Sequence, residues 1–358
     1  MPINSELMED ARRVADMAPS ILNTKPWSLS PAKDDDRIEL RADWNRRLTV
    51  IDPRHRELVI SCGAALFNVR MAIRVTGHDL AYTLMPAKHT SSDECPDPEC
   101  TFSGLLATVE VASHRIHAAT RRERRLYEAI ERRHTVREPF SPIGMNMVVA
   151  LERAARREGV YAVLLNEPEA KCLLKEAAEA SQELAGDKSH REQLEDWTGD
   201  GPHVSVSPDY GVPAEKFAPE PKSPRYPSLL RRASARAARP PVRDLGLSWH
   251  GTGSAKFEKH PTLIALGTKT DRPSDWMHMG LALQRLLLTA TRHNVAASFL
   301  TQQLEVDDWK CEHNNEWWPS PKPEALLRRP TGAWVRSGTT QIIIRLGYSD
   351  PQGPGKVA

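Results

Sequence analysis

The sequence predicts an α+β fold in which two related halves lie in one chain. Its 358 residues are too many for one ordinary hydrophobic core. Each half has one long apolar helix, expected over residues 57–75 and 276–293, and the first carries apolar residues on nearly every face. An apolar strand pattern follows each helix. The chain is therefore expected to form two halves, each with strands around a buried helix.

The two long helices also align with each other. When residues 63–73 are placed over residues 280–290, Gly63 meets Gly280, and three of the eleven aligned positions are identical. Three identities prove nothing alone, but they agree with two related halves.

Local patterns define the elements of the first half. A helix over residues 8–17 should stop near Pro19, because proline lacks a backbone N–H. Charged and apolar residues alternate over residues 37–42, which is typical of a strand with one buried face. The other elements expected here are an extended run from Trp27, strands at 81–85 and 105–111, and a basic helix that closes at 127–133.

Capping residues define the two long helices. Asp52 is the expected N-cap of the first helix, with Pro53 at its first position, and Gly77 is expected to end it. Ser274 and Asp275 are expected to cap the second. The other elements expected in the second half are helices at 148–157 and 167–185 and strands at 160–165, 260–266, 295–301 and 340–348.

Composition restricts the class of protein. Lys and Arg number 49 and Asp and Glu 47, so the net charge is only +2, which argues against a nucleic-acid binder. No apolar run is expected to span a bilayer, and the N-terminus lacks an apolar signal core, so no membrane partner is expected. The five cysteines form no CxxC pair, and their odd number indicates reduced thiols in a cytoplasmic protein.

Cys95 and Cys100 could form half of a metal site, with His89 nearby. A zinc site needs further ligands at matching spacing, and the sequence shows none. No metal is therefore expected.

Residues 18–27 contain a candidate ligand-binding loop. Pro19 and Pro26 interrupt the backbone, and Ser20 and Asn23 can form hydrogen bonds with nearby backbone or with a ligand. The loop could present fixed polar groups to a flat ligand, with Trp27 at its exit. Local chemistry alone favours an ordinary polar turn followed by a core tryptophan.

A second candidate site is the basic segment at residues 132–137. Arg133 and Arg137 offer planar forks of donors that match a phosphate, and Thr135 adds a hydroxyl. A solvated charged linker between the halves explains the same residues, and unaided it is the favoured interpretation. His134 is expected to orient an arginine or to face solvent.

Residues 198–253 are rich in Pro, Gly, Ser and Arg. The segment could be a basic arm that binds nucleic acid, a linker, or a lid over a site. The sequence does not separate these alternatives.

Both candidate segments resemble motifs of one family. Pro-Ser-x-x-Asn-x-x-Pro-Trp, from Pro19 to Trp27, resembles the flavin-contacting loop of the FMN-dependent nitroreductases. It is still more similar to the Acg-like family, in which two nitroreductase-like halves are fused in one chain. Arg133, Thr135 and Arg137 match the phosphate-binding motif that opens nitroreductase chains. The loop departs from the Acg-like pattern at Lys25, where glutamine is common.

The resemblance implies an architecture. Residues 1–120 and 121–358 would be nitroreductase-like halves, each with a central antiparallel sheet flanked by helices, and together they would imitate a homodimer. Two such chains could also associate with each other. Residues 198–253 would be a lid. The first half has the loop without the arginine motif, and the second has the motif without the loop, so the chain should hold one FMN rather than two.

The resemblance also implies roles for individual residues. The second half would hold the FMN phosphate and ring edge through Arg133, Thr135 and Arg137. The first half would contact the ring and ribityl chain through Pro19, Ser20, Ile21 and Asn23. A backbone N–H near Thr301 and Gln302 would reach the flavin, and Arg345 or Arg336 would be a C-terminal phosphate ligand. No acid, base or nucleophile constellation is apparent, so no catalytic residue is assigned.

Two functions follow from this resemblance. The first is an oxidoreductase that takes electrons from NADH or NADPH and reduces a nitro compound, a quinone or a similar small acceptor. The second is a protein that stores or sequesters FMN under a lid without turnover. A nucleic-acid-binding module around residues 231–243 is the least favoured alternative, because the overall charge is balanced.

Overall fold

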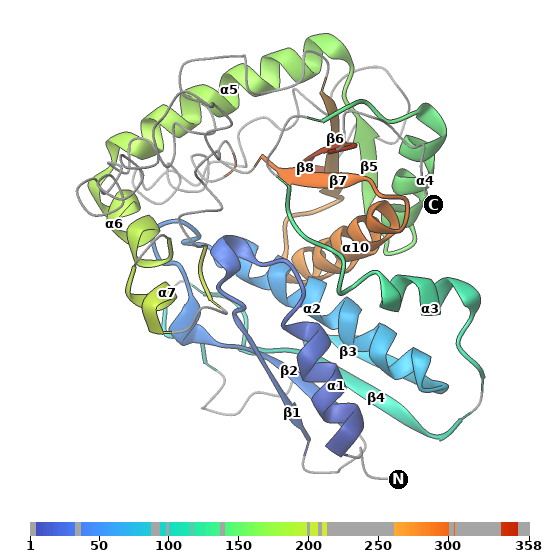
Figure 1. Cartoon of the computed structure of the whole chain (residues 1–358). Helices are drawn as coiled ribbons and strands as arrows, with labels where there is room; N and C mark the ends of the chain where they lie inside the picture. Colours follow the sequence, from blue (N-terminus) through green and yellow to red (C-terminus); the bar gives the residue numbers. More distant parts are fainter. Residues whose placement is uncertain are drawn as a thin grey trace, which may run out of the picture.

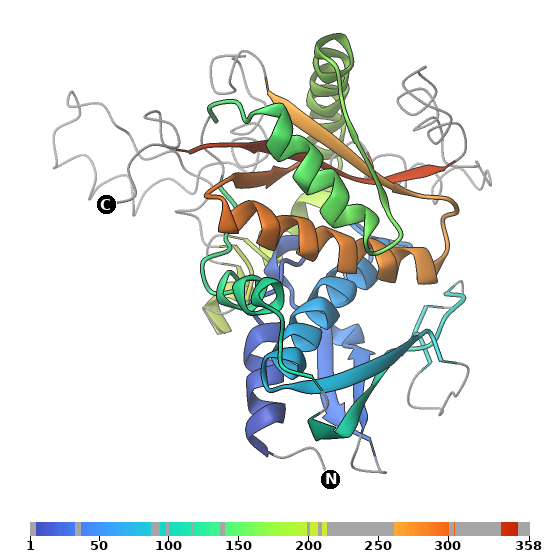
Figure 2. The same cartoon turned by 90° about the vertical axis from the view of Figure 1, so that its right-hand side faces the viewer.

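The computed structural model describes residues 5–32, 37–86, 94–97, 100–115, 117–136, 140–198, 201–206, 210–212, 261–300, 304 and 338–349. Within these residues the chain forms two four-stranded antiparallel sheets, each packed on one long helix (Figure 1). The views of Figures 1 and 2 show the layers in the order sheet, helix, helix, sheet. This arrangement of helices and antiparallel sheets confirms the predicted α+β class.

The first sheet comes from the N-terminal part of the chain. Its strand order is β1-β2-β4-β3, and helix α2 lies between β2 and β3 in sequence. The elements are α1 (Ser5–Ala15), η1 (Ile21–Asn23), β1 (Trp27–Pro31), β2 (Arg37–Ala42), η2 (Trp44–Arg46), α2 (Arg56–Val75), β3 (His78–Leu84) and β4 (Leu105–Arg115).

The second sheet repeats this arrangement. Its order is β5-β6-β8-β7, and α10 lies between β6 and β7, where α2 lies in the first. The elements are α3 (Arg121–Glu128), α4 (Met145–Arg156), β5 (Tyr161–Leu164), α5 (Glu167–Gly186), α6 (Lys188–Asp196), α7 (Pro202–Val206), β6 (Thr262–Thr268), α10 (Pro273–Arg292), β7 (Ala296–Phe299) and β8 (Thr339–Gly347). The expected boundary at residues 120 and 121 falls between β4 and α3, and it stays a prediction.

The centre of the molecule is the crossing of α2 and α10. At this crossing Gly63 and Gly280 lie against each other: a Cβ added to Gly280 would be 2.0 Å from the carbonyl oxygen of Ile60 and 2.6 Å from the Cα of Gly63. Only glycine permits so close an approach of two backbones. The two residues that the sequence alignment superimposes therefore meet in space.

Two buried polar contacts also join these helices. Gln284 of α10 donates to the side-chain oxygen of Asn68 of α2 at 2.7 Å, and both residues are fully buried. Glu158, which is also buried, accepts from Arg70 of α2 at 2.9 Å and from Arg285 of α10 at 2.6 Å. Because a buried carboxylate needs partners, this bridge fixes how the helices sit against each other.

The starts of both long helices differ from the prediction. Helix α2 begins at Arg56 rather than at Pro53, and its N-cap is His55 in a left-handed conformation with φ 58°. Asp52 still satisfies the helix start from outside, because its carboxylate accepts from the N–H groups of Glu57 and Leu58. Helix α10 begins at Pro273, ahead of the expected caps Ser274 and Asp275. The expected stop at Gly77, with φ 87°, is confirmed.

Helix α2 contradicts the expectation that no apolar run is long enough to span a bilayer. By length and composition alone its 20 residues could cross a membrane, and it is the one such helix within the described residues. However, 83% of its most apolar window is buried inside the molecule. A buried core helix of a globular protein gives the same signal.

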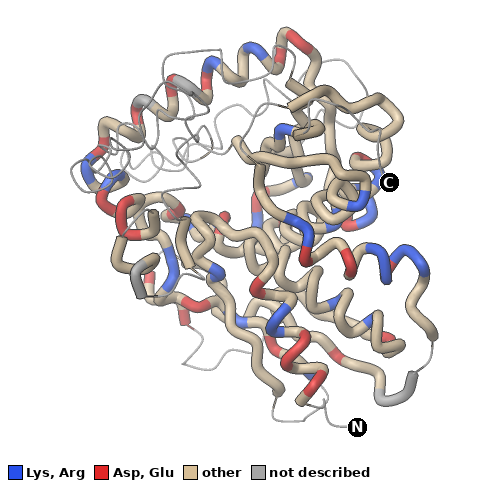
Figure 3. Tube along the Cα trace, in the orientation of Figure 1, with Lys and Arg blue, Asp and Glu red and all other residues tan. Residues whose placement is uncertain are grey.

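Charges on the described residues are mixed. Figure 3 shows basic residues gathered on α3 and both signs alternating along α5.

Candidate functional site

The arginine motif of the second half meets the loop of the first half. After α3 the chain turns, and the N–H of Arg133 donates to the carbonyl of Ala129. The Arg133 side chain then reaches back to the end of α1, where Nη2 donates to the carbonyl oxygen of Met17 at 3.3 Å. Met17 lies two residues before Pro19, so the fold brings the two predicted motifs together.

Arg133 also has unused hydrogen-bonding capacity. Its Nε is buried and has no hydrogen-bond partner within the described part of the chain. Burial lowers the pKa of this guanidinium from 12.5 to about 10, and no neighbouring carboxylate opposes that shift. The side chain as a whole is half-buried, and a cation with a buried donor is normally paired with an anion. The geometry therefore fits an anionic group of a ligand at this position.

Thr135 lies beside the edge strand of the second sheet. It forms an isolated parallel bridge with Ala297 of β7, and the N–H of Val136 donates to the Ala297 carbonyl at 3.0 Å. Farther along, Ser141 pairs with Tyr348, just after β8. Arg137 lies outside the described residues, as do Thr301, Gln302 and Arg336. His134 is exposed, and its Nδ1 lies 2.9 Å from the carbonyl oxygen of Arg132, so it contacts an arginine's backbone rather than its side chain.

Arg345 is fully buried on the central strand β8. Its guanidinium carbon lies 4.1 Å from the centre of the Phe140 ring, an arrangement that stabilises a cation over an aromatic face. Its strand partners are Leu263 on β6 and Ser298 on β7. Ser298 is also fully buried, and its hydroxyl has no hydrogen-bond partner among the described residues.

The predicted loop has an unusual backbone. Leu22, Asn23 and Lys25 have positive φ angles of 44°, 55° and 47°. Non-glycine residues rarely adopt this region, and each costs about 1–3 kcal/mol unless surrounding contacts hold it. Such strain is concentrated at functional sites in proteins. An ordinary polar turn does not require three such residues within four positions.

Contacts from three directions hold the loop. Within it, Ser20 Oγ accepts from the N–H of Lys25 at 3.0 Å. From α2, Ser61 Oγ accepts from the N–H of Ile21 at 3.3 Å. From η2, Arg46 donates to the Lys25 carbonyl at 2.8 Å. The hydroxyl of Ser20 is therefore used by the loop itself, and it orients the backbone.

The segment between β5 and β6 (residues 165–261), called the insertion below, contacts this loop through Tyr210 and Gly211. The amide of Asn23 donates to the Gly211 carbonyl at 3.0 Å, and the N–H of Gly211 donates to the Asn23 carbonyl at 3.2 Å. Beside them, the ring of Tyr210 lies 4.3 Å from the guanidinium carbon of Arg46 and 5.5 Å from Nζ of Lys25. Asn23 is thus joined to the insertion.

The sequence does not reveal several residues that shape the site. Met17 contributes a carbonyl, Ser61 is one polar residue within an apolar helix, and Ala297 contributes backbone. Gly211 and Tyr210 lie in a segment for which no contact could be predicted. None of these residues belongs to a recognisable local pattern. A shallow depression of about 640 Å³ over the first sheet is lined by none of the predicted site residues.

Comparisons with known proteins find relatives that match most of this chain. No protein-family model matches the chain. A protein of Mycobacterium tuberculosis strain H37Rv named "Putative NAD(P)H nitroreductase Rv3131" is 29% identical over 98% of this chain and 89% of its own length. The "Uncharacterized protein Rv3127" of the same strain is 26% identical over 90% of this chain and 86% of its own length.

Among solved structures, one similar chain is the FMN-dependent nitroreductase NfnB from Mycobacterium smegmatis in complex with NADPH. It is 14% identical, its TM-score is 0.34, and the match covers 64% of this chain and 90% of that one. A putative nitroreductase from Anabaena variabilis matches 97% of this chain and 74% of its own, with 13% identity and a TM-score of 0.37. Scores this low carry no argument about the site.

Proposed function

We propose that this protein is a flavin-dependent oxidoreductase that binds one FMN where its two halves meet and takes electrons from NADH or NADPH. The observation that carries the proposal is Arg133, whose partly unsatisfied guanidinium contacts the carbonyl of Met17, two residues before the Pro19–Asn23 loop. The similarity, over 98% of this chain, to the protein named "Putative NAD(P)H nitroreductase Rv3131" supports the same reaction class. The acceptor is then a nitro compound, a quinone or a similar small molecule.

The residues present fit an FMN phosphate. The buried Nε of Arg133 has no hydrogen-bond acceptor among the described residues. No carboxylate among those residues pairs with its charge. Arginine binds phosphate through parallel N–H donors, so a phosphate would satisfy both the donor and the charge. Thr135 and Arg137 are proposed to complete this subsite.

The loop of the first half is proposed to position the flat part of the ligand. Its left-handed residues keep the backbone around Ile21 in one shape, while Ser61 and Arg46 hold it from outside. Pro19 and Ser20 then line the ligand without rearranging. FMN, when bound, supplies the hydride and electron chemistry. The chain's own contribution is to bind it, orient it and exclude water.

The two halves are proposed to descend from one unit, so that the monomer imitates a dimer. Identical strand order in the two sheets supports this proposal. So does the contact of Gly63 with Gly280 at the helix crossing, since equivalent residues meet on the axis of a twofold interface. Once fused, the halves are free to diverge, which accounts for one site rather than two.

Storage of FMN is the second candidate, and a specific contact favours it. The insertion bonds to Asn23 through backbone and side chain, and Tyr210 lies over the neighbouring cations. We propose that this insertion is a lid. A lid that stays closed would retain FMN and exclude an acceptor.

A binding experiment tests the site. The purified protein is titrated with FMN and the bound flavin is measured by absorption and fluorescence quenching. Arg133→Gln should weaken FMN binding about 10- to 100-fold, because a hydrogen bond to a charged group contributes about 1.5–3 kcal/mol. Arg132→Gln is the matched control, since Arg132 is the exposed neighbour and should have no effect. Equal affinity of the two variants, or two FMN per chain, would overturn the proposed site.

Anaerobic mixing with NADPH or NADH separates the two functions. In an enzyme the flavin absorption bleaches and returns when an acceptor is added. A flavin that stays oxidised with both nucleotides favours storage.

A further inference from the structure

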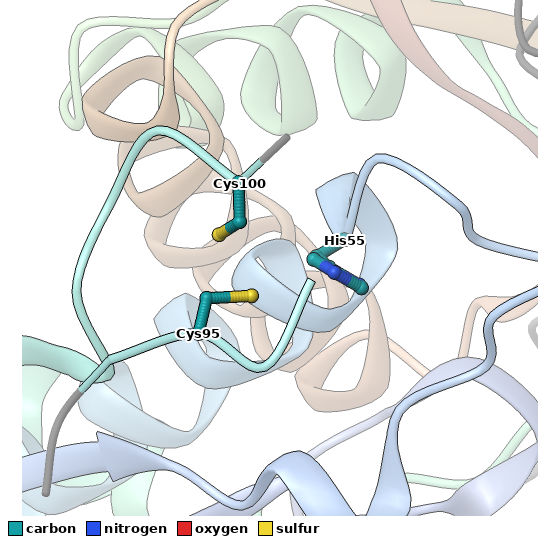
Figure 4. Close-up of side chains that lie close together, drawn as sticks. All are labelled: His55, Cys95 and Cys100. Carbon is teal, nitrogen blue, oxygen red and sulfur yellow. The ribbon is translucent and has the colours of Figure 1, made fainter. Parts of the chain in front are cut away.

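A cluster of metal-binding side chains lies at the start of α2, and none of its members belongs to the proposed flavin loop. His55, Cys95 and Cys100 each offer one ligand atom, and these atoms all lie within 4.8 Å of one another (Figure 4). His55 comes from the start of α2, and the cysteines come from the connection between β3 and β4. His55 is distant from both cysteines along the chain, so spacing in the sequence does not reveal it as a third ligand.

The imidazole of His55 is buried without being satisfied. The side chain is 2% exposed, and neither ring nitrogen has a hydrogen bond within the described residues. Its Nε2 nevertheless lies 2.7 Å from Oδ2 of Asp97. Histidines that bind metals commonly face a carboxylate with the second ring nitrogen, which fixes the orientation of the ring. Here that arrangement leaves Nδ1 for a cation.

Charge balance supports a divalent cation. Two cysteine thiolates would carry two negative charges, which one divalent ion neutralises. The charge of Asp97 is already countered, because Nε of Arg47 lies 3.2 Å from the same Oδ2. The site would therefore be close to neutral overall, as a half-buried position requires.

We propose that His55, Cys95 and Cys100 bind one zinc ion, with Asp97 as the residue that orients the imidazole. Two sulfur ligands and one imidazole favour zinc over magnesium or calcium, which prefer oxygen. Three protein ligands leave a fourth position for water. Cys95 and Cys100 are half-buried, so an ion can reach them from solvent.

The position of the cluster indicates what the metal would do. Beyond Cys100, Phe102 packs against Trp44 and against Trp276 of α10, with ring centres 5.9 and 6.2 Å apart. Zinc would fasten the cysteine-bearing connection to the start of α2 and hold Phe102 between Trp44 of η2 and Trp276 of α10. The proposed role is therefore to hold this connection in place beside η2, whose Arg46 supports the flavin loop.

Cobalt binding tests the proposal in the full chain. The reduced protein is titrated with Co²⁺ without air, and we expect one ion per chain with the visible bands of tetrahedral cobalt and a thiolate charge-transfer band. Cys95→Ser and Cys100→Ser should each abolish the charge-transfer signal. Cys172→Ser is the matched control, because Cys172 is exposed on α5 and lies outside the cluster. Unchanged spectra in both cluster variants would overturn the assignment.

A second measurement needs no variant. Native protein with and without Zn²⁺ is treated with iodoacetamide, and modified cysteines are mapped by mass spectrometry. We expect Zn²⁺ to protect Cys95 and Cys100 at least tenfold while Cys172 reacts equally in both samples. If the reduced chain shows no such protection, or if a Cys95–Cys100 disulfide forms and the reduced protein takes up no metal, the proposal is wrong.

Discussion

The contact between Gly63 and Gly280 allows a quantitative test of how the two halves are joined. In Gly280→Ala, the new Cβ would lie 2.0 Å from the Ile60 carbonyl oxygen and 2.7 Å from the N of Ala64. Both atoms are backbone, so no side-chain rotation can relieve the overlap. Ordinary contact begins at 3.4 Å, and α2 and α10 must therefore separate by about 1.4 Å at the crossing.

The free-energy cost follows from that separation. A gap of about 0.5–1 Å already removes a quarter to a half of the attraction between packed atoms, and a larger shift affects both helices along the crossing. Overpacking of a core costs about 1–3 kcal/mol, and this case lies at the upper end because the obstacle is rigid. Alanine returns about 1 kcal/mol through its higher helix propensity. The free energy of unfolding should fall by about 2 kcal/mol.

The assay is urea unfolding followed by circular dichroism and tryptophan fluorescence. Gly63→Ala should be destabilised less than Gly280→Ala, because its Cβ would meet the Met277 carbonyl oxygen at 2.4 Å rather than 2.0 Å. Gly186→Ala is the control: Gly186 ends α5 and has open space around its Cβ position, so its stability should change by less than about 0.5 kcal/mol. A Gly280→Ala protein as stable as the native chain would refute this account of the crossing.

Three further perturbations test other parts of the structure. Glu158→Gln leaves Arg70 and Arg285 without their shared buried carboxylate and should cost about 3 kcal/mol of unfolding free energy, measured in urea. Burial alone would raise the pKa of Asp271, but Arg54 and hydrogen bonds from Gln341 and Trp276 outweigh it and hold that pKa below 3.8. Asp271 therefore stabilises the fold above about pH 4 and loses this effect as the pH falls through its folded pKa; Asp271→Asn should flatten the acid limb of a stability–pH curve. Tyr210→Ala removes the ring beside Arg46 and should speed FMN release in a stopped-flow chase if the insertion is a lid, whereas an unchanged rate contradicts that role.

The fold could be predicted where the signal is local. Alternation over residues 37–42 and the apolar run before Gly77 depend on nearest neighbours along the chain, and the observed elements match them closely. The helix starts were less predictable, because capping depends on geometry. Asp52 does satisfy N–H groups of α2, yet it does so across an intervening left-handed His55 rather than from the N-cap position.

The candidate site was predictable only as two separate motifs. The sequence offers Arg133 and the Pro19 loop as candidates by residue type, and only the resemblance to nitroreductase motifs favours them over a charged linker and an ordinary turn. It cannot show that Arg133 ends at the Met17 carbonyl, since a carbonyl has no sequence signature. Partners far apart in sequence, such as Asn23 and Gly211 or His55 and Cys95, are brought together by tertiary packing alone.

The strain in the loop links binding to the packing of the rest of the chain. Leu22, Asn23 and Lys25 hold left-handed conformations that the loop cannot maintain alone, at a cost of about 1–3 kcal/mol each. The contacts that offset this cost come from α2, from η2 and from the insertion at Gly211. Undocking the insertion removes one of these supports, so the loop should relax and lose its binding geometry at the same time. Under the proposed lid role, docking of the insertion and pre-organisation of the loop would be one equilibrium, so a ligand that requires the strained loop would also favour the docked insertion.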